Sequence, residues 1–424
     1  MSPILASILM CRASLGFMSR SSGRHNAVRL FSVSKAANVN MGVSRLETLQ
    51  TLLSKHGAPG SKGCAEKNDL DPVFVDSADE ETPQLISELM GIDEYVNLHP
   101  HLYPLARSKS TGNLVCALRR AYADDTNEWY ENSASAPWPI VEAKLGGLGM
   151  RLLALNSEHL MRRIVCECDS SGEGKELIDI YNEGLGKGKI KDTGLDQPYE
   201  PGSVDKLGVS ISYLFDFCLC PHAMHVLIFY LLLKYGVDKY VLLRVGPFAD
   251  IYETLALGHA QKGDESSALI SAEAANNKIS GFASTFLFYA RLLNSFPSRE
   301  EETRDAARMC LRIPLPSIGL SEEEFKQVAV LGQIADNSDS MPEVMAKLQR
   351  MYEKMKEHEE EQAKDPRQSQ GKTPEQAAID EASYLLDVVA LSGGNWSEVR
   401  PKLAEIYRSV GQNEMADFVD PKNS

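Results

Sequence analysis

The sequence predicts an all-α protein built from stacked helical hairpins. Two observations support this fold class. Apolar residues recur at three- and four-residue intervals through most of the chain, as on the buried side of a helix, and no long stretch alternates apolar with polar residues as a half-buried strand would. Helix-start signals precede several of the periodic stretches: Ser321 with Glu324 forms a capping box, and Thr373 stands before Pro374.

The N-terminus, residues 1–35, reads as an organellar transit peptide. The first acidic residue of the chain is Glu47, and the segment before it is rich in Arg and Ser, a composition typical of such peptides. The stretch Arg29–Ser32 resembles a matrix-processing site, with an arginine shortly before an aromatic residue and a serine. The mitochondrial matrix is therefore the predicted compartment, with the plastid stroma as the alternative.

Two segments follow before the repeats begin. Residues 36–82 predict a short helix and a flexible linker. Residues 83–234 predict an N-terminal helical block, interrupted by a glycine-rich surface insertion at 169–202. The helical spacing of this block is carried by Leu114, Ala117, Leu118, Tyr122, Met150, Leu153, Leu160, Ile164 and Val165. Asn156–His159 predicts an exposed, polar helix face.

The most apolar part of the chain runs from Leu207 to Leu233. After Pro221 its longest run without a charge or a histidine is Val226–Leu233, which is far shorter than the roughly twenty residues that a bilayer requires. This segment therefore predicts two buried helices and no transmembrane span.

Residues 235–320 place small and apolar residues at regular offsets. From Leu255 the chain gives an apolar residue, a small residue and His259, then a turn at Gly263-Asp264 and three alanines. The two adjacent matching units are Leu255, Ala256, His259, Ala268, Ala272 and Ala275, and then Ala290, Arg291, Asn294, Thr303, Ala307, Cys310 and Pro314. A third, detached unit lies near the C-terminus, with Leu403, Ala404, Tyr407, Gly411 and Ala416. These offsets resemble, in degenerate form, the tetratricopeptide family of helical repeats.

The resemblance implies a TPR-like α-solenoid whose concave face binds another polypeptide. In that family the first helix of each unit lines the inner face. By resemblance, the partner-binding residues are Tyr252, His259, Phe288 and Tyr407. The C-terminal region, residues 321–424, continues with capped amphipathic helices around a polar linker at 365–372.

One constellation has metal-ligand chemistry. Cys218, Cys220, His222 and His225 lie within eight residues, and sulfur and imidazole are ligands for zinc or copper. Their spacing matches no standard zinc finger, and cysteine in an apolar segment is usually buried. The predicted interpretation is core packing without a metal.

Composition limits the function classes. The formal net charge of −15 disfavours binding to nucleic-acid phosphates, and no signature of a catalytic site or a cofactor site is found. The favoured function is a soluble organellar scaffold or complex-assembly factor that binds a protein partner, and an enzymatic role is left open but is less favoured. One alternative is a metal-binding protein or enzyme that uses the Cys218–His225 cluster. A second is an organellar RNA-binding protein built from helical repeats.

Overall fold

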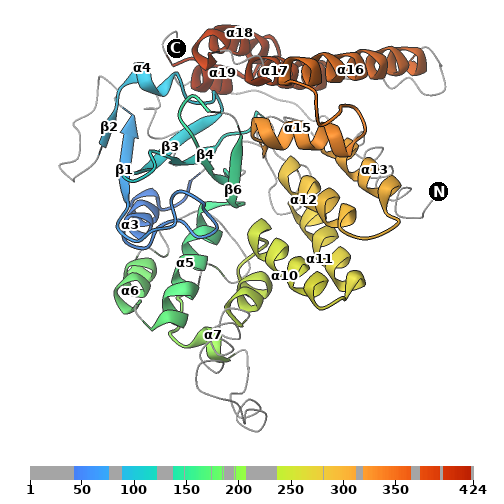
Figure 1. Ribbon diagram of the computed structural model, residues 1–424. Coiled ribbons are helices and arrows are strands. Elements are labelled where there is room, and N and C mark those ends of the chain that lie inside the picture. The colour runs from blue at the N-terminus through green and yellow to red at the C-terminus, as the bar shows by residue number, and fades with distance from the viewer. Residues whose placement is uncertain are drawn as a thin grey trace, which may run out of the picture.

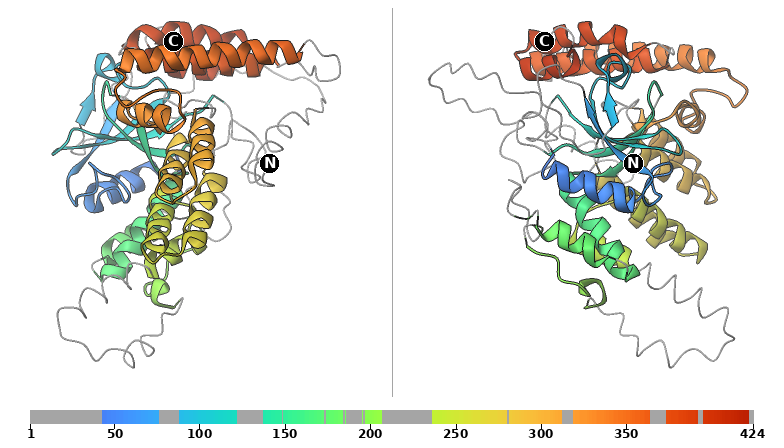
Figure 2. Two further views of the ribbon diagram at one scale, coloured as in Figure 1. Left: turned by 45° about the vertical axis from the view of Figure 1, so that its right-hand side comes forward. Right: turned by 90° about the vertical axis from the view of Figure 1, so that its left-hand side faces the viewer.

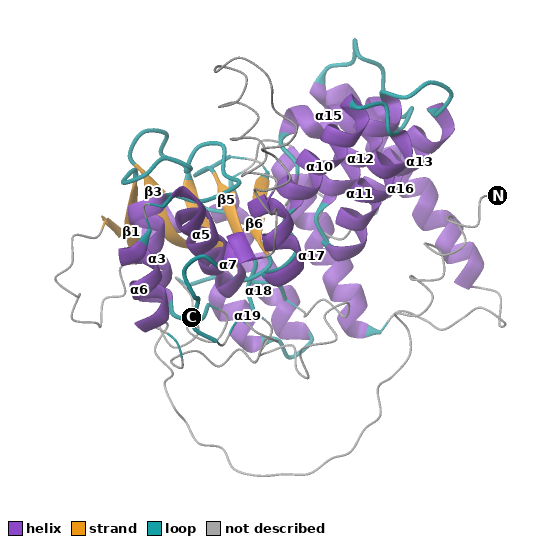
Figure 3. Ribbon diagram, turned by 90° about the horizontal axis from the view of Figure 1, so that it is seen from below, coloured by secondary structure: helices purple, strands orange, loops and turns teal. Residues whose placement is uncertain are grey.

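The computed structural model of the chain describes residues 43–75, 88–121, 137–147, 149–172, 174–183, 185, 195, 197–206, 236–279, 281–311, 319–363, 373–391 and 395–421. Within these residues a mixed sheet and its covering helices form one side, and helical hairpins with a C-terminal helical layer form the rest (Figure 1). Seen from below, the strands gather on one side and α10–α13 on the other (Figure 3).

A six-stranded sheet organises the N-terminal part, with the strand order β2-β1-β3-β4-β5-β6. β1 pairs with β2 in parallel, and the remaining neighbours in this order are antiparallel. The strands are Leu70–Val75 (β1), Glu88–Met90 (β2), Leu102–Ser108 (β3), Leu114–Leu118 (β4), Ile140–Ala143 (β5) and Met150–Ala154 (β6). The prediction of an all-α fold is therefore wrong for this part of the chain, and the block at residues 83–234 is not purely helical.

Strand β4 shows why the sheet escaped the pattern analysis. Leu114, Cys116 and Leu118 join the hydrophobic core on one face of the sheet, whereas Val115 and Ala117 join the core on the other face. Because both faces are buried, the strand is a continuous apolar run with no polar alternation, and such a run cannot be told from a buried helix by periodicity. The three- and four-residue spacing of Leu114, Ala117 and Leu118 arises because every residue of this strand is apolar, and it does not reflect a helix.

Helices cover both faces of the sheet. On one face α3 (Leu46–His56) and α5 (Ser157–Ser171) share a core with the strands, and α6 (Lys175–Glu183) and α7 (Ser203–Lys206) pack against α5. On the other face lie α4 (Ile92–Tyr95) and apolar residues at the ends of helices from the next region, including Ala249 and Phe282. The sheet is thus joined directly to the helical hairpins that follow it.

The helices predicted between Ile251 and Cys310 are present as two antiparallel hairpins. They are α10 (Ala249–Gln261) with α11 (Glu265–Lys278), and α12 (Ala283–Asn294) with α13 (Glu300–Cys310). Ala256, Ala268 and Ala272 are completely buried, so their small side chains let the helices approach closely. The predicted turn at Gly263 is also present, and its positive φ of 76° suits glycine.

The C-terminal region is helical, as predicted. It comprises α15 (Glu322–Leu331), α16 (Met341–Ala363), α17 (Pro374–Leu391), α18 (Trp396–Ser409) and α19 (Asn413–Val419). The capping box of Ser321 and Glu324 is confirmed, and the Thr373 hydroxyl accepts a hydrogen bond from the Gln376 N–H at 3.2 Å. Helices α16–α19 form a layer along one edge of the molecule (Figure 2).

Several predictions fall outside the described residues. They concern the transit peptide at 1–35, the processing site at Arg29–Ser32, the apolar segment Leu207–Leu233 and the linker at 365–372. The domain boundaries as a set stay a prediction. Among the helices that the structure describes, none combines the length and the apolar character needed to cross a membrane.

Candidate protein-interaction site

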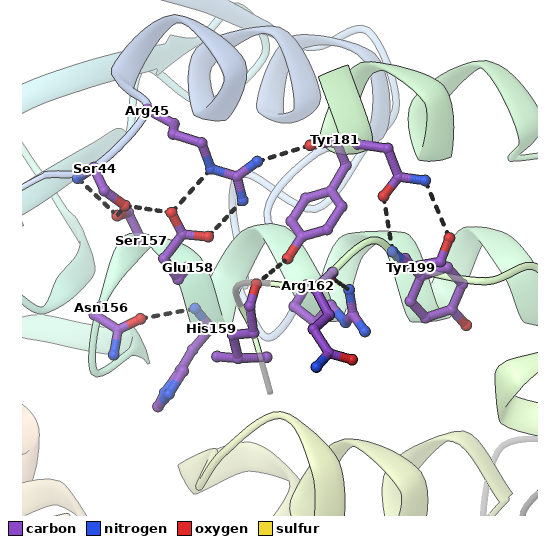
Figure 4. A network of polar contacts seen from close by, with 12 residues as sticks. Ser44, Arg45, Asn156, Ser157, Glu158, His159, Arg162, Tyr181 and Tyr199 are labelled. Atoms are coloured by element: carbon purple, nitrogen blue, oxygen red, sulfur yellow. Dashed lines mark hydrogen bonds and ion pairs between the residues drawn. The ribbon is translucent and has the colours of Figure 1, made fainter. Parts of the chain in front are cut away.

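A buried polar network surrounds the start of α5 (Figure 4). The Arg45 guanidinium donates from Nε and Nη2 to the Glu158 carboxylate, at 2.9 Å and 2.5 Å, and from Nη1 to the Tyr181 carbonyl at 2.7 Å. The Ser44 hydroxyl donates to the same carboxylate at 2.5 Å. Burial lowers the pKa of Arg45, but the hydrogen bonds and charge of Glu158 outweigh burial and raise it overall.

This network corrects the sequence interpretation of Asn156–His159. The Asn156 side chain caps α5 by accepting from the His159 N–H at 2.8 Å, and all four residues are buried and not on an exposed helix face. The charged groups of Arg45 and Glu158 pair with each other where α3, α5 and α6 meet. The network therefore holds three helices, α3, α5 and α6, together.

A second buried ion pair joins the sheet region to the hairpins. Arg163 of α5 donates from Nη1 and Nη2 to the two carboxylate oxygens of Asp250, at the start of α10, at 2.7 Å and 2.6 Å. Arg163 also donates to Glu167 at 2.9 Å, and its guanidinium lies 4.8 Å from the centre of the Phe248 ring. A bidentate pair adds geometric specificity as well as stabilising energy, so this contact sets the position of α10 on α5.

A third buried cation anchors the C-terminal layer to the sheet. Arg400 of α18 is 1% exposed and donates to four backbone carbonyls. The acceptors and distances are Val96 at 2.8 Å, Val419 at 2.7 Å, Tyr95 at 3.1 Å and Leu98 at 2.6 Å. Burial lowers the pKa of Arg400. The contact ties residues about three hundred positions apart.

Two histidines lie at the same interface. The ring of His99 contacts Trp396 with the ring centres 4.6 Å apart, and His101 Nε2 lies 2.8 Å from the Tyr407 hydroxyl. Burial, with the positive charge of Arg400 as a further cause, lowers the pKa of His99 far below its ordinary value and that of His101 to about 3. Both rings are therefore neutral near pH 7.

The five cysteines that the structure describes are buried. Burial raises the pKa of Cys64 and of Cys166 to about 12, and it also raises the pKa of Cys116 and Cys310. A thiol that stays protonated is a poor nucleophile and a poor metal ligand. Among the residues that the structure describes, no group of three or more His, Cys, Asp or Glu is arranged to hold a metal ion.

The predicted site residues separate into three sets. Cys218, Cys220, His222 and His225 lie outside the described residues, so the metal alternative remains a prediction. Phe288 and Tyr407 are buried in the cores of the hairpins and of the C-terminal layer. Tyr252 and His259 are partly accessible on α10, with His259 Nδ1 3.5 Å from Asp264. Partner binding by these residues stays a prediction.

Sequence reasoning did not single out the three buried arginines. A signal was available for Arg400, because it lies on the same helical stripe as Trp396, Leu403 and Tyr407, which are buried. A charged residue on an otherwise apolar helix face must form an ion pair or hydrogen bonds when that face is buried.

Several large apolar side chains are exposed on the helical part of the structure. On the hairpins, Leu257 of α10 and Ile270 of α11 are 47% and 63% exposed. On the C-terminal layer, Tyr384 and Val388 of α17 are 57% and 39% exposed.

Comparison with known proteins gives three findings. A family model described as the PAB middle domain matches residues 249–335, and one described as the PAB C-terminal domain matches residues 349–422. The chain is 28% identical over 322 residues to the Arabidopsis thaliana protein named Protein IN CHLOROPLAST ATPASE BIOGENESIS, chloroplastic, covering 75% of this chain and 78% of the relative. No solved structure matches.

Proposed function

We propose that this chain is a plastid protein that assists the assembly of the chloroplast ATPase by binding one of its polypeptides. The observation that carries the proposal is the similarity to a protein named for chloroplast ATPase biogenesis, over three quarters of both chains. A match of that length includes the sheet region as well as the hairpins, so it extends over the ion pairs that join them.

The hairpins α10–α13 supply the binding face in this proposal. They are similar to the PAB middle domain, and they carry the exposed Leu257 and Ile270 as well as the partly accessible Tyr252 and His259. A TPR-like arrangement of these hairpins would bind an extended or helical segment along one side. The acidic chain would bind a polypeptide and not a nucleic acid, because phosphate binding needs a basic surface.

The plastid replaces the mitochondrion as the proposed compartment. The relative is named as chloroplastic, which supports the alternative weighed from the N-terminal composition and lends nothing to the mitochondrial prediction. Arg- and Ser-rich, acid-poor sequence is typical of both kinds of transit peptide, so composition alone does not decide between them.

The test is complementation of an Arabidopsis line that lacks the relative. The chain would be expressed with a C-terminal affinity tag, and a parallel line would carry the relative's own transit peptide in place of residues 1–35. We expect the chloroplast ATPase level to be restored and at least one ATPase subunit to co-purify with the tag. An unchanged ATPase level in both lines, with the protein imported and no subunit bound, would refute the proposal.

A further inference from the structure

Helix α17 has an apolar strip on its outer side. Ala378, Ala382, Leu386 and Ala390 form its buried side and share one hydrophobic core with residues of α18 and α19. Ala377, Tyr384 and Val388 are exposed, and their spacing of seven and four residues places them in one row on the opposite side. Tyr384, with 57% of its surface exposed, is the largest group in this row.

Carboxylates border this strip on both sides. At about 100° per residue, Asp380 and Asp387 lie along one edge of the row and Glu381 lies along the other. Asp380 accepts a hydrogen bond from Gln376 at 3.0 Å within the same helix. The sequence of α17 contains Glu375, Asp380, Glu381 and Asp387 but no Lys, Arg or His. Within α17 itself, the apolar strip therefore lies between two margins whose only charged side chains are acidic.

We infer that this strip, Ala377–Val388 of α17, docks a basic amphipathic helix of a partner polypeptide, an inference that rests on the proposed function. One row of apolar side chains has the width that a single helix can cover, and the bound helix would place an apolar ridge over Tyr384 and Val388. Its Lys and Arg side chains would then meet the carboxylates at both margins, as complementary charges do across protein interfaces.

The charge pattern excludes the other occupants of an apolar strip. A second copy of this chain would bring the same carboxylates against Asp380 and Glu381, and like charges at an interface are repulsive. An anionic membrane surface and nucleic-acid phosphates would be repelled in the same way. An exposed tyrosine at the centre with charges at the rim is the usual arrangement of a protein-binding surface.

The test has two arms on the full-length tagged chain in the complemented plants. First, a photo-crosslinking amino acid replaces Tyr384 in one line and Glu405 in another, and the crosslinked peptides are identified by mass spectrometry. Glu405 is the matched control position, because it is exposed in the middle of α18 in the same layer. Second, Asp380→Lys/Glu381→Lys and Glu405→Lys chains are compared for binding to a synthetic peptide of the segment captured at position 384.

We expect capture at position 384 of a segment in which Lys and Arg flank a helical apolar ridge. We expect the double reversal at 380 and 381 to weaken peptide binding about tenfold or more, and Glu405→Lys to change it less than about twofold. Capture of an acidic or extended segment, or equal weakening by both charge variants, would overturn the inference. If ATPase subunits co-purify but nothing crosslinks at 384, the inference fails and the proposed function stands; if no subunit co-purifies, both fail.

Discussion

Arg400 allows the docking of the C-terminal layer to be tested quantitatively. Its guanidinium makes four hydrogen bonds to backbone carbonyls between the sheet region and α19. At about 1.5 kcal/mol for each bond from a charged donor, these contribute about 6 kcal/mol. These per-bond values are already net of desolvation, and removing one partner of a buried charged contact typically costs about 3–5 kcal/mol, so we take the lower end of that range as the expected loss. We therefore expect Arg400→Met to lower the free energy of unfolding by about 3 kcal/mol.

The measurement is urea unfolding followed by tryptophan fluorescence. Trp396 lies in this interface, and Trp138 contacts Phe418 at its edge with ring centres 5.6 Å apart, so both report on the docking of α18 and α19. Arg408→Met is the control, since Arg408 is on the same helix, is exposed and forms an ion pair with the exposed Asp417 at 3.0 Å. Its expected cost is about 0.5 kcal/mol or less. Equal unfolding midpoints for the two variants would refute the anchoring role of Arg400.

Three further predictions concern the buried groups. The pKa values of His99 and His101 are lowered in the folded state, so their contribution to stability is fully present well above pH 6.5 and is lost as the pH falls through 6.5. At pH 5.5 each histidine costs about 1.4 kcal/mol relative to high pH. A His99→Asn/His101→Gln chain should lose that part of the slope when unfolding is measured from pH 7.5 to 5.5. Asp250→Asn leaves the buried Arg163 guanidinium without its bidentate partner. We expect it to lower the free energy of unfolding, measured in thermal or urea melts, by about 3 kcal/mol or more. An unchanged melting curve would mean that Glu167 alone compensates the charge of Arg163. Cys64, Cys116, Cys166, Cys168 and Cys310 should remain unmodified by iodoacetamide in the native protein and become modified in urea, as peptide mapping would show; rapid native labelling of any of them would contradict its burial.

The helices were predictable where local signals and burial agree. Ser321 with Glu324 and Thr373 with Gln376 start their helices by the capping bonds that their residue types predict. The hairpin turn at Gly263 followed from a residue that tolerates positive φ. The small residues Ala268 and Ala272 also lie at the helix crossing that their spacing predicted. These features depend on neighbours within a few positions.

The sheet and the ion pairs were not predictable in the same way. β4 is covered on both faces, so its sequence shows no alternation, and its pairing with β5 depends on a segment that begins only at Ile140. The start of α5 was predicted to be exposed because Glu158 is charged, yet its partner Arg45 lies more than a hundred residues away. Long-range pairing of this kind leaves no local pattern.

The contact between Arg400 and the carbonyls of Tyr95, Val96 and Leu98 also constrains the order in which the protein can mature. Residues 95–101 are made early in synthesis, and the helices that shield them, α18 and α19, emerge about three hundred residues later. Until then, these carbonyl groups and the imidazole rings of His99 and His101, which are buried in the folded protein, must remain hydrated or be covered by a chaperone. Because contacts so distant in sequence form slowly, we expect the packing of α18 and α19 against residues 95–101 to be the last step of folding.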